Sequence, residues 1–139
     1  MKYEYRFRPG YNSDSLMLEF SINDDLNKQF IIDFLETIKE IEPKLTSSED
    51  LWMNDTLIHI FESNLGQFEI SIDIWGGIFI SSEENQNCLN KINKILESND
   101  NFIKIEVNYE DYKTTKKEIE KKEIEYSLFD KLLILLKLK

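Results

Sequence analysis

The sequence contains one histidine and one cysteine, residue types that often carry out proton-transfer or nucleophilic chemistry. His59 lies between Ile58 and Ile60 in an apolar run, and no serine or cysteine nucleophile stands at a recognisable motif spacing from it. Cys88 lies beside Leu89 on the apolar side of a predicted helix, where a thiol acts as a small hydrophobe. We therefore expect a structural histidine, an inert thiol and no catalytic residue.

Carboxylate pairs such as Glu69 and Asp73 carry the oxygen ligands needed for acid–base or metal chemistry. The chain holds 27 acidic residues, however, so such pairs arise by chance. One cysteine and one histidine cannot build a Cys/His zinc site. Gly76 and Gly77 lack the spacing of a phosphate-binding loop and precede an apolar strand rather than a helix. We expect neither a metal nor a cofactor.

Charge and composition narrow the class of protein further. The 139 residues suit a single domain, and an apolar fraction of 41% is enough for one hydrophobic core. The formal charge of −10 repels nucleic acid and anionic membranes. The first residues carry charges where a signal peptide needs an apolar stretch, and no apolar run is long enough to span a membrane. We expect a cytoplasmic protein that contacts neither nucleic acid nor membrane.

The elements that must position these residues begin with two alternating runs, 2–8 and 16–22, which predict an antiparallel strand pair. A helix is predicted from Asn23 to Ile41, because apolar residues recur every three or four positions until Pro43 ends the pattern. Residues 44–56 are expected to form a loop or a single helical turn.

The second half of the chain continues with strands over 57–62 and 67–75 and a returning strand over 78–81. A capping box of Ser81 and Glu84 predicts a second helix, and a last strand is expected over 102–109. This order predicts the α+β class: a twisted antiparallel sheet of about six strands with two helices on one face and a C-terminal amphipathic helix.

The turn at Gly76 and Gly77 determines the first candidate partner-binding surface. A two-residue turn there pairs Trp75 with Ile78. The outward face of this hairpin, opposite the core, then combines acidic and large apolar side chains: Glu69, Asp73, Trp75, Ile78 and Ile80. Such a face suits a protein contact. The alternative is that the C-terminal helix covers the apolar members as a second core layer.

A second candidate surface is an acidic cluster at the end of the first helix and in the loop that follows it. Its acidic members are Glu36, Glu40, Glu42, Glu49, Asp50 and Asp55. Trp52 and Met53 lie within the same loop, which would allow it to enter a basic cleft of a partner. The alternative is an ordinary solvated face.

The C-terminal segment differs in charge from the rest of the chain. Residues 1–112 carry 9 basic and 22 acidic side chains, a net charge of −13, whereas residues 113–139 carry 8 and 5, a net charge of +3. We expect an acidic domain over 1–112 and an amphipathic helix over 115–136, with apolar residues at Tyr126, Phe129, Leu133 and Leu136. That helix requires burial against the second face of the sheet, a second copy of the chain, or lipid.

Small size, strong acidity, the expected cytoplasmic location and a sheet with helices but no catalytic motif resemble the immunity proteins of bacterial polymorphic toxin systems, including contact-dependent inhibition systems. The resemblance implies a non-enzymatic protein that binds one cognate toxin domain, often a nuclease, and blocks its active or substrate-binding surface. A different class remains open, a structural or adaptor subunit that forms a homodimer through its C-terminal helix.

Overall fold

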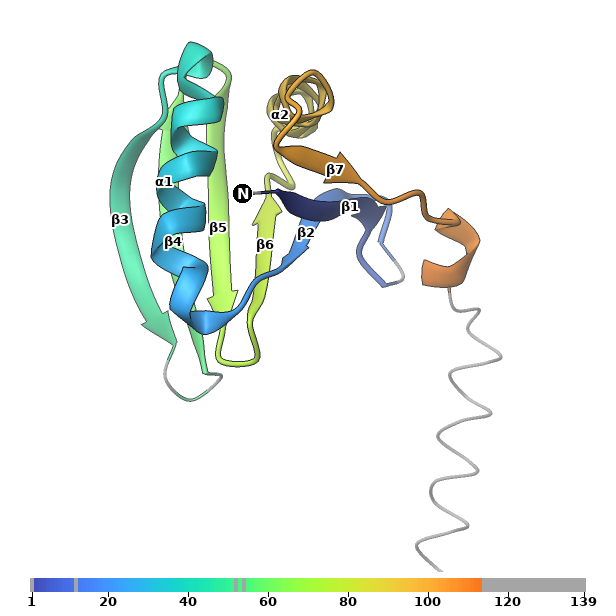
Figure 1. Ribbon diagram of the computed structural model, residues 1–139, viewed down its shortest axis with the longest axis horizontal. Coiled ribbons are helices and arrows are strands. Elements are labelled where there is room, and N and C mark those ends of the chain that lie inside the picture. The colour runs from blue at the N-terminus through green and yellow to red at the C-terminus, as the bar shows by residue number, and fades with distance from the viewer. Residues whose placement is uncertain (1, 12, 52, 54, 114–139) are drawn as a thin grey trace, which may run out of the picture.

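The computed structural model describes residues 2–11, 13–51, 53 and 55–113 of the chain, and these form a seven-stranded sheet with two helices on one face (Figure 1). The strands are β1 (Tyr3–Pro9), β2 (Leu16–Ser21), β3 (Lys44–Leu51), β4 (Thr56–Ser63), β5 (Gly66–Asp73), β6 (Gly77–Ser81) and β7 (Phe102–Lys104). Their order in the sheet is β3-β4-β5-β6-β2-β1-β7. The expected α+β class is confirmed, but the predicted antiparallel sheet is wrong: the sheet is mixed, because β7 pairs in parallel with β1, and it has one more strand than predicted.

The helices α1 (Asn27–Thr37) and α2 (Gln86–Glu97) cover the same face of this sheet. Two neighbouring inward residues of β1 show this directly. The Tyr3 hydroxyl donates a hydrogen bond to Asp33 of α1 at 2.6 Å, and the Tyr5 hydroxyl donates one to Asn93 of α2 at 3.1 Å. Between the layers lies a core rich in aromatic and branched side chains, among them Phe20, Phe30, Phe34, Phe68, Ile70, Leu89 and Ile92.

The predicted helices are present, but their first turns differ from expectation. The residues after Asn23 form a short 3-10 turn (Asp24–Leu26) before α1 begins, and a second 3-10 turn (Lys39–Ile41) follows it. The predicted capping box is wrong, because Ser81 is still paired within the sheet and α2 begins after Asn85. The following residue, Ser82, donates its hydroxyl to the Gln67 carbonyl of β5 at 2.6 Å.

The structure differs from the predicted elements in two segments. Residues Lys44–Leu51, expected to be part of a loop, form strand β3, which pairs antiparallel with β4. All eight of its side chains are exposed, so the segment has no alternation of apolar residues from which to recognise a strand. The predicted last strand is shorter than expected, since only Phe102–Lys104 pair with β1, in parallel, and Tyr109–Tyr112 form a 3-10 turn.

The hairpin between β5 and β6 has a different register from the predicted one. Ile78 lies opposite Ile72, not Trp75, so that residues 74–76 form a longer loop. The two registers differ by an odd number of residues, and an odd shift moves every side chain to the other face of the sheet. Ile78 and Ile80 are therefore fully buried in the core, and the expectation that they face outward is wrong.

The predicted C-terminal helix over 115–136 lies outside the described residues. Within the described part of the chain, no helix is long and apolar enough to cross a membrane.

Candidate partner-binding surface

Two hairpin turns meet at one end of the sheet, the lower end in Figure 1. One connects β3 to β4 and contains Met53 and Asp55; the other is the β5–β6 loop. The backbone N–H of Ile74 donates a hydrogen bond to the Asp55 carbonyl at 3.2 Å and joins the two turns. We call this region the hairpin-tip surface and define it by Asp50, Met53, Asp55, Asp73, Ile74 and Trp75. It combines members of both surfaces that the sequence suggested separately.

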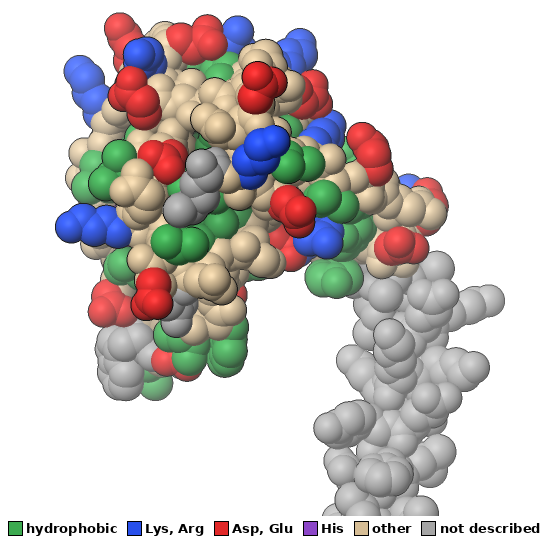
Figure 2. All heavy atoms as spheres, in the orientation of Figure 1, with side chains coloured by type: hydrophobic (Ala, Val, Ile, Leu, Met, Phe, Trp, Pro, Cys, Tyr) green, Lys and Arg blue, Asp and Glu red, His purple; other side chains and the backbone are tan. Residues whose placement is uncertain are grey.

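Large apolar side chains are exposed on the hairpin-tip surface. The exposed fraction is 77% for Trp75, 80% for Met53 and 56% for Ile74. In Figure 2, hydrophobic and acidic side chains lie next to one another at this end of the molecule. Tryptophan is one of the residue types most often found at the hot spots of protein–protein interfaces.

Hydrogen bonds to Asp73 hold the backbone of the β5–β6 loop at Trp75 and at Gly77. One carboxylate oxygen of Asp73 accepts bonds from the backbone N–H groups of Trp75 at 2.9 Å and Gly77 at 2.7 Å. Gly76 between them has a φ of 84°, a conformation that glycine adopts without strain. The loop is thereby tied to the end of β5, which reduces the conformational entropy that Trp75 would lose on binding a partner.

A hollow of about 410 Å³ lies beneath the two turns, and Asp50, Asp55 and Asp73 are among the residues that line it. Three aspartates in the lining favour occupation by a cationic group such as a lysine or arginine side chain. Among the described residues, no group of three or more histidine, cysteine, aspartate or glutamate side chains is arranged to hold a metal ion.

The other residues that the sequence suggested as partner-binding candidates are not part of the hairpin-tip surface. Glu69 borders a separate hollow of about 530 Å³ with Glu62, Glu83 and Glu84, near the start of α2. Glu49 projects from β3 opposite Ile58 and away from the helices. Trp52 lies outside the described residues.

Part of the second acidic cluster is engaged in ion pairs with lysines. Glu36 pairs with Lys39 at 3.0 Å, and Glu40 pairs with Lys91 at 3.6 Å. Both pairs are exposed to solvent, where such contacts contribute little energy. These glutamates belong to a solvated face, and they lie outside the hairpin-tip surface.

The single histidine and the single cysteine each share a hydrogen bond with a serine. His59 shares a hydrogen bond with the Ser48 hydroxyl at 2.8 Å and so connects β4 to β3. Cys88 is fully buried, and burial raises the pKa of its thiol although a hydrogen bond with Ser63 acts in the opposite direction. A thiol of this kind is not activated as a nucleophile.

Ile74 is a member of the hairpin-tip surface that sequence reasoning missed. Strict alternation along 67–75 placed it on the core side, but β5 ends at Asp73 and the alternation ends with it. The signal that could have located the loop is Asp73 itself, because an aspartate side chain often accepts a hydrogen bond from the backbone N–H two residues further along a turn, here that of Trp75. Comparisons with protein families, with curated proteins and with solved structures found no match to this chain.

Proposed function

We propose that this protein is a cytoplasmic immunity protein that binds a basic toxin domain, most simply a nuclease, and covers its active or substrate-binding surface. The observation that carries the proposal is Trp75, which is 77% exposed on a loop held by Asp73, while the adjacent Asp73 and Ile74 line a hollow together with Asp50 and Asp55. The proposal also rests on the overall charge of −10.

Physical complementarity supports this choice of partner. A nuclease holds the phosphates of its substrate with lysine and arginine side chains, and those side chains pair equally well with carboxylates. Asp50, Asp55 and Asp73 offer such carboxylates around one hollow. Trp75 and Met53 supply apolar area to exclude water from the contact. The net charge increases the rate at which a basic partner arrives.

The first test concerns the coding sequence next to the gene of this protein. The proposal expects a toxin with a basic C-terminal domain there, and expression of that domain should stop bacterial growth unless this protein is present. Growth arrest that this protein does not relieve, or a neighbour without a toxin domain, would contradict the proposal. A homodimer without affinity for the domain would instead support the adaptor class.

The second test locates the interface with two variants of equal charge change. The tip variant carries Asp50→Asn, Asp55→Asn and Asp73→Asn, and the control variant carries Glu69→Gln, Glu83→Gln and Glu84→Gln around the other hollow. Asparagine tolerates the positive φ of 54° at position 55. The tip variant should bind the purified toxin domain more slowly, and the control variant should bind nearly as the unchanged protein does.

Trp75→Ala should mainly increase the dissociation rate. Loss of a buried aromatic anchor costs about 2 kcal/mol or more, which corresponds to a Kd increase of roughly 30-fold. Surface plasmon resonance measures both rates. Equal binding by Trp75→Ala and the unchanged protein would place the interface elsewhere.

A further inference from the structure

The face of the sheet opposite the helices carries large apolar side chains that no described helix covers. Ile58, Ile60, Met17 and Phe79 are half-buried there, and we call this region the open sheet face. Ile58 and Phe79 lie in one row across the sheet, separated only by Ser71. Ile60 and Met17 lie in the next row, with Glu69 and Ser81 between them.

The chain itself arrives on this face at the end of the described residues. Arg8 alternates with the inward-facing Phe7, so its side chain lies on the open sheet face, where it pairs with Glu19. The Tyr112 ring lies 4.7 Å from the Arg8 guanidinium carbon, and the Phe79 ring lies 5.9 Å from the same atom. The described chain therefore ends close to Arg8, whose guanidinium also lies over the Phe79 ring.

The sequence of residues 114–139 fits this face in pattern, charge and length. Its apolar residues Tyr126, Phe129, Leu133 and Leu136 recur at helical spacing. Its 7 basic and 5 acidic side chains give a net charge of +2, opposite in sign to the acidic body of the protein. As a helix it would be about 39 Å long, whereas a sheet of seven strands is about 29 Å wide. The segment is thus long enough to extend from Phe79 to β4.

We propose that residues 114–139 pack across the open sheet face of their own chain and form a third layer over Ile58, Ile60 and Phe79. A segment tethered at Lys113 has an effective concentration in the millimolar range at this face, far above that of a second copy. Two copies that each carry a net charge of −10 also repel one another. This packing is independent of the proposed function, and the hairpin-tip surface remains accessible.

Paramagnetic broadening in NMR spectra tests the proposal with the full chain. A nitroxide label is attached through Lys131→Cys, while Cys88 stays unlabelled because it is fully buried. The amide signals of Ile58, Ile60 and Phe79 should lose most of their intensity, and those of α1 should not. The control label at Lys91→Cys, on the exposed side of α2, should leave the open sheet face unaffected.

A mixed sample identifies whose segment is bound. Protein that carries ¹⁵N but no nitroxide is combined with ¹⁴N protein that carries the nitroxide. Only the ¹⁵N protein gives signals, so only contacts between two copies can broaden them. The proposal is supported if the amide signals of the open sheet face are broadened in the singly labelled sample but not in the mixed sample. Broadening that persists would assign the face to a second copy and overturn it, as would intact signals at Ile58, Ile60 and Phe79 in the singly labelled sample.

A matched pair of substitutions adds a second measurement. Ile60→Lys places a charge in the open sheet face and should restore the Phe79 amide signal of the labelled protein. Ile32→Lys makes the same change at an exposed position of α1 and should not. Retained broadening in a folded Ile60→Lys variant would also contradict the proposal.

Discussion

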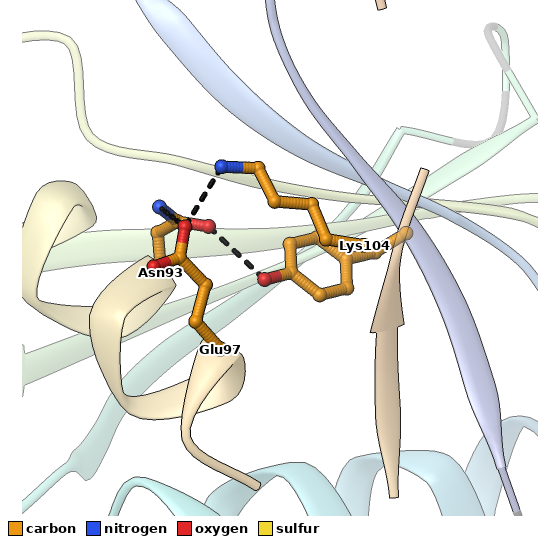
Figure 3. Close-up of polar contacts among 4 residues, drawn as sticks. Asn93, Glu97 and Lys104 are labelled. Atoms are coloured by element: carbon orange, nitrogen blue, oxygen red, sulfur yellow. Dashed lines mark hydrogen bonds and ion pairs between the residues drawn. The ribbon is translucent and has the colours of Figure 1, made fainter. Parts of the chain in front are cut away.

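Asn93 is a buried polar side chain at the centre of a small hydrogen-bond network. It accepts from the Tyr5 hydroxyl at 3.1 Å and donates to Glu97 at 3.0 Å. Lys104 of β7 donates to the same Glu97 oxygen at 2.8 Å, as Figure 3 shows. The network connects β1, α2 and the short edge strand β7. The bond from Lys104 contributes most to the lowered pKa of Glu97.

Asn93→Leu should destabilise the protein by about 1–3 kcal/mol, because it leaves the buried Tyr5 hydroxyl without its acceptor. Urea denaturation followed by circular dichroism measures this change. Asn90→Leu on the exposed side of the same helix is the matched control and should change stability by much less. Similar losses in the two variants would indicate that helix propensity, not the network, is responsible.

Asp33 makes stability depend on pH through its contact with Tyr3. Hydrogen bonds from Tyr3 and Gln29 lower the pKa of Asp33 below its ordinary value of 3.8. A carboxylate with a lowered pKa stabilises the fold fully above its unfolded pKa, and this contribution is lost as pH falls below that value. The pKa of Tyr3 moves up to about 12, chiefly by burial and then by the bond to Asp33.

Asp33→Asn should therefore reduce the acid sensitivity of the protein. The free energy of unfolding of the unchanged protein should fall as the pH decreases below the ordinary pKa of 3.8, and that of the variant should fall less. Denaturation curves at a series of pH values measure both. Tyr3→Phe, which removes one hydrogen bond but keeps the carboxylate, should act in the same direction. Parallel pH profiles for the unchanged protein and Asp33→Asn would exclude this linkage.

At the scale of elements, the β5–β6 hairpin shows what sequence pattern determines and what it does not. Alternation of apolar residues located both strands to within two residues at each end, because the core face must be apolar. The register of the hairpin depends on the length of the loop between the strands. The two adjacent glycines suggested a loop shorter than the one that the protein forms. The Asp73 carboxylate stabilises the longer loop by accepting two backbone hydrogen bonds, an interaction that apolar alternation does not reveal.

Gly76→Ala should destabilise this hairpin by about 1–3 kcal/mol. The φ of 84° is unfavourable for alanine, and the added Cβ would lie 2.6 Å from the Ile22 carbonyl oxygen. Gly10→Ala is the control, since a Cβ there meets Met17 and Ser13 at ordinary contact distances of 3.4 and 3.5 Å. Thermal unfolding of the two variants distinguishes the positions, and equal melting temperatures would contradict the role given to Gly76.

At the scale of the whole molecule, the α+β class and most of the core followed from sequence because burial imposes alternation and helical spacing. The two edge strands of the sheet, β3 and β7, were not predicted correctly from the sequence. β3 buries no side chain and therefore leaves no hydrophobic pattern, whereas the strand predicted over 102–109 is present only as the three residues of β7. The hairpin-tip surface could be predicted only in parts, since its residues come from two turns that the register brings together.

Electrostatic attraction is a property of the whole molecule, and it should appear in the salt dependence of association. The Debye length decreases from about 10 Å at 0.1 M salt to about 3 Å at 1 M. The association rate with the toxin domain should therefore decrease strongly over this range, whereas the dissociation rate should change little. Stopped-flow measurement of tryptophan fluorescence, to which both Trp52 and Trp75 contribute, can follow the reaction. An association rate independent of salt would exclude electrostatic steering.

The exposed edge strand β3 also affects how this protein behaves in concentrated solution. Its outer edge offers backbone donors and acceptors along eight residues, and such an edge can pair with the same edge of another copy to start aggregation. At neutral pH the negative charges of Glu49 and Asp50 and of the whole chain keep copies apart. Near the isoelectric point of about 4.6 this repulsion disappears. Mildly acidic buffers should therefore favour precipitation of folded protein, before acid unfolds it.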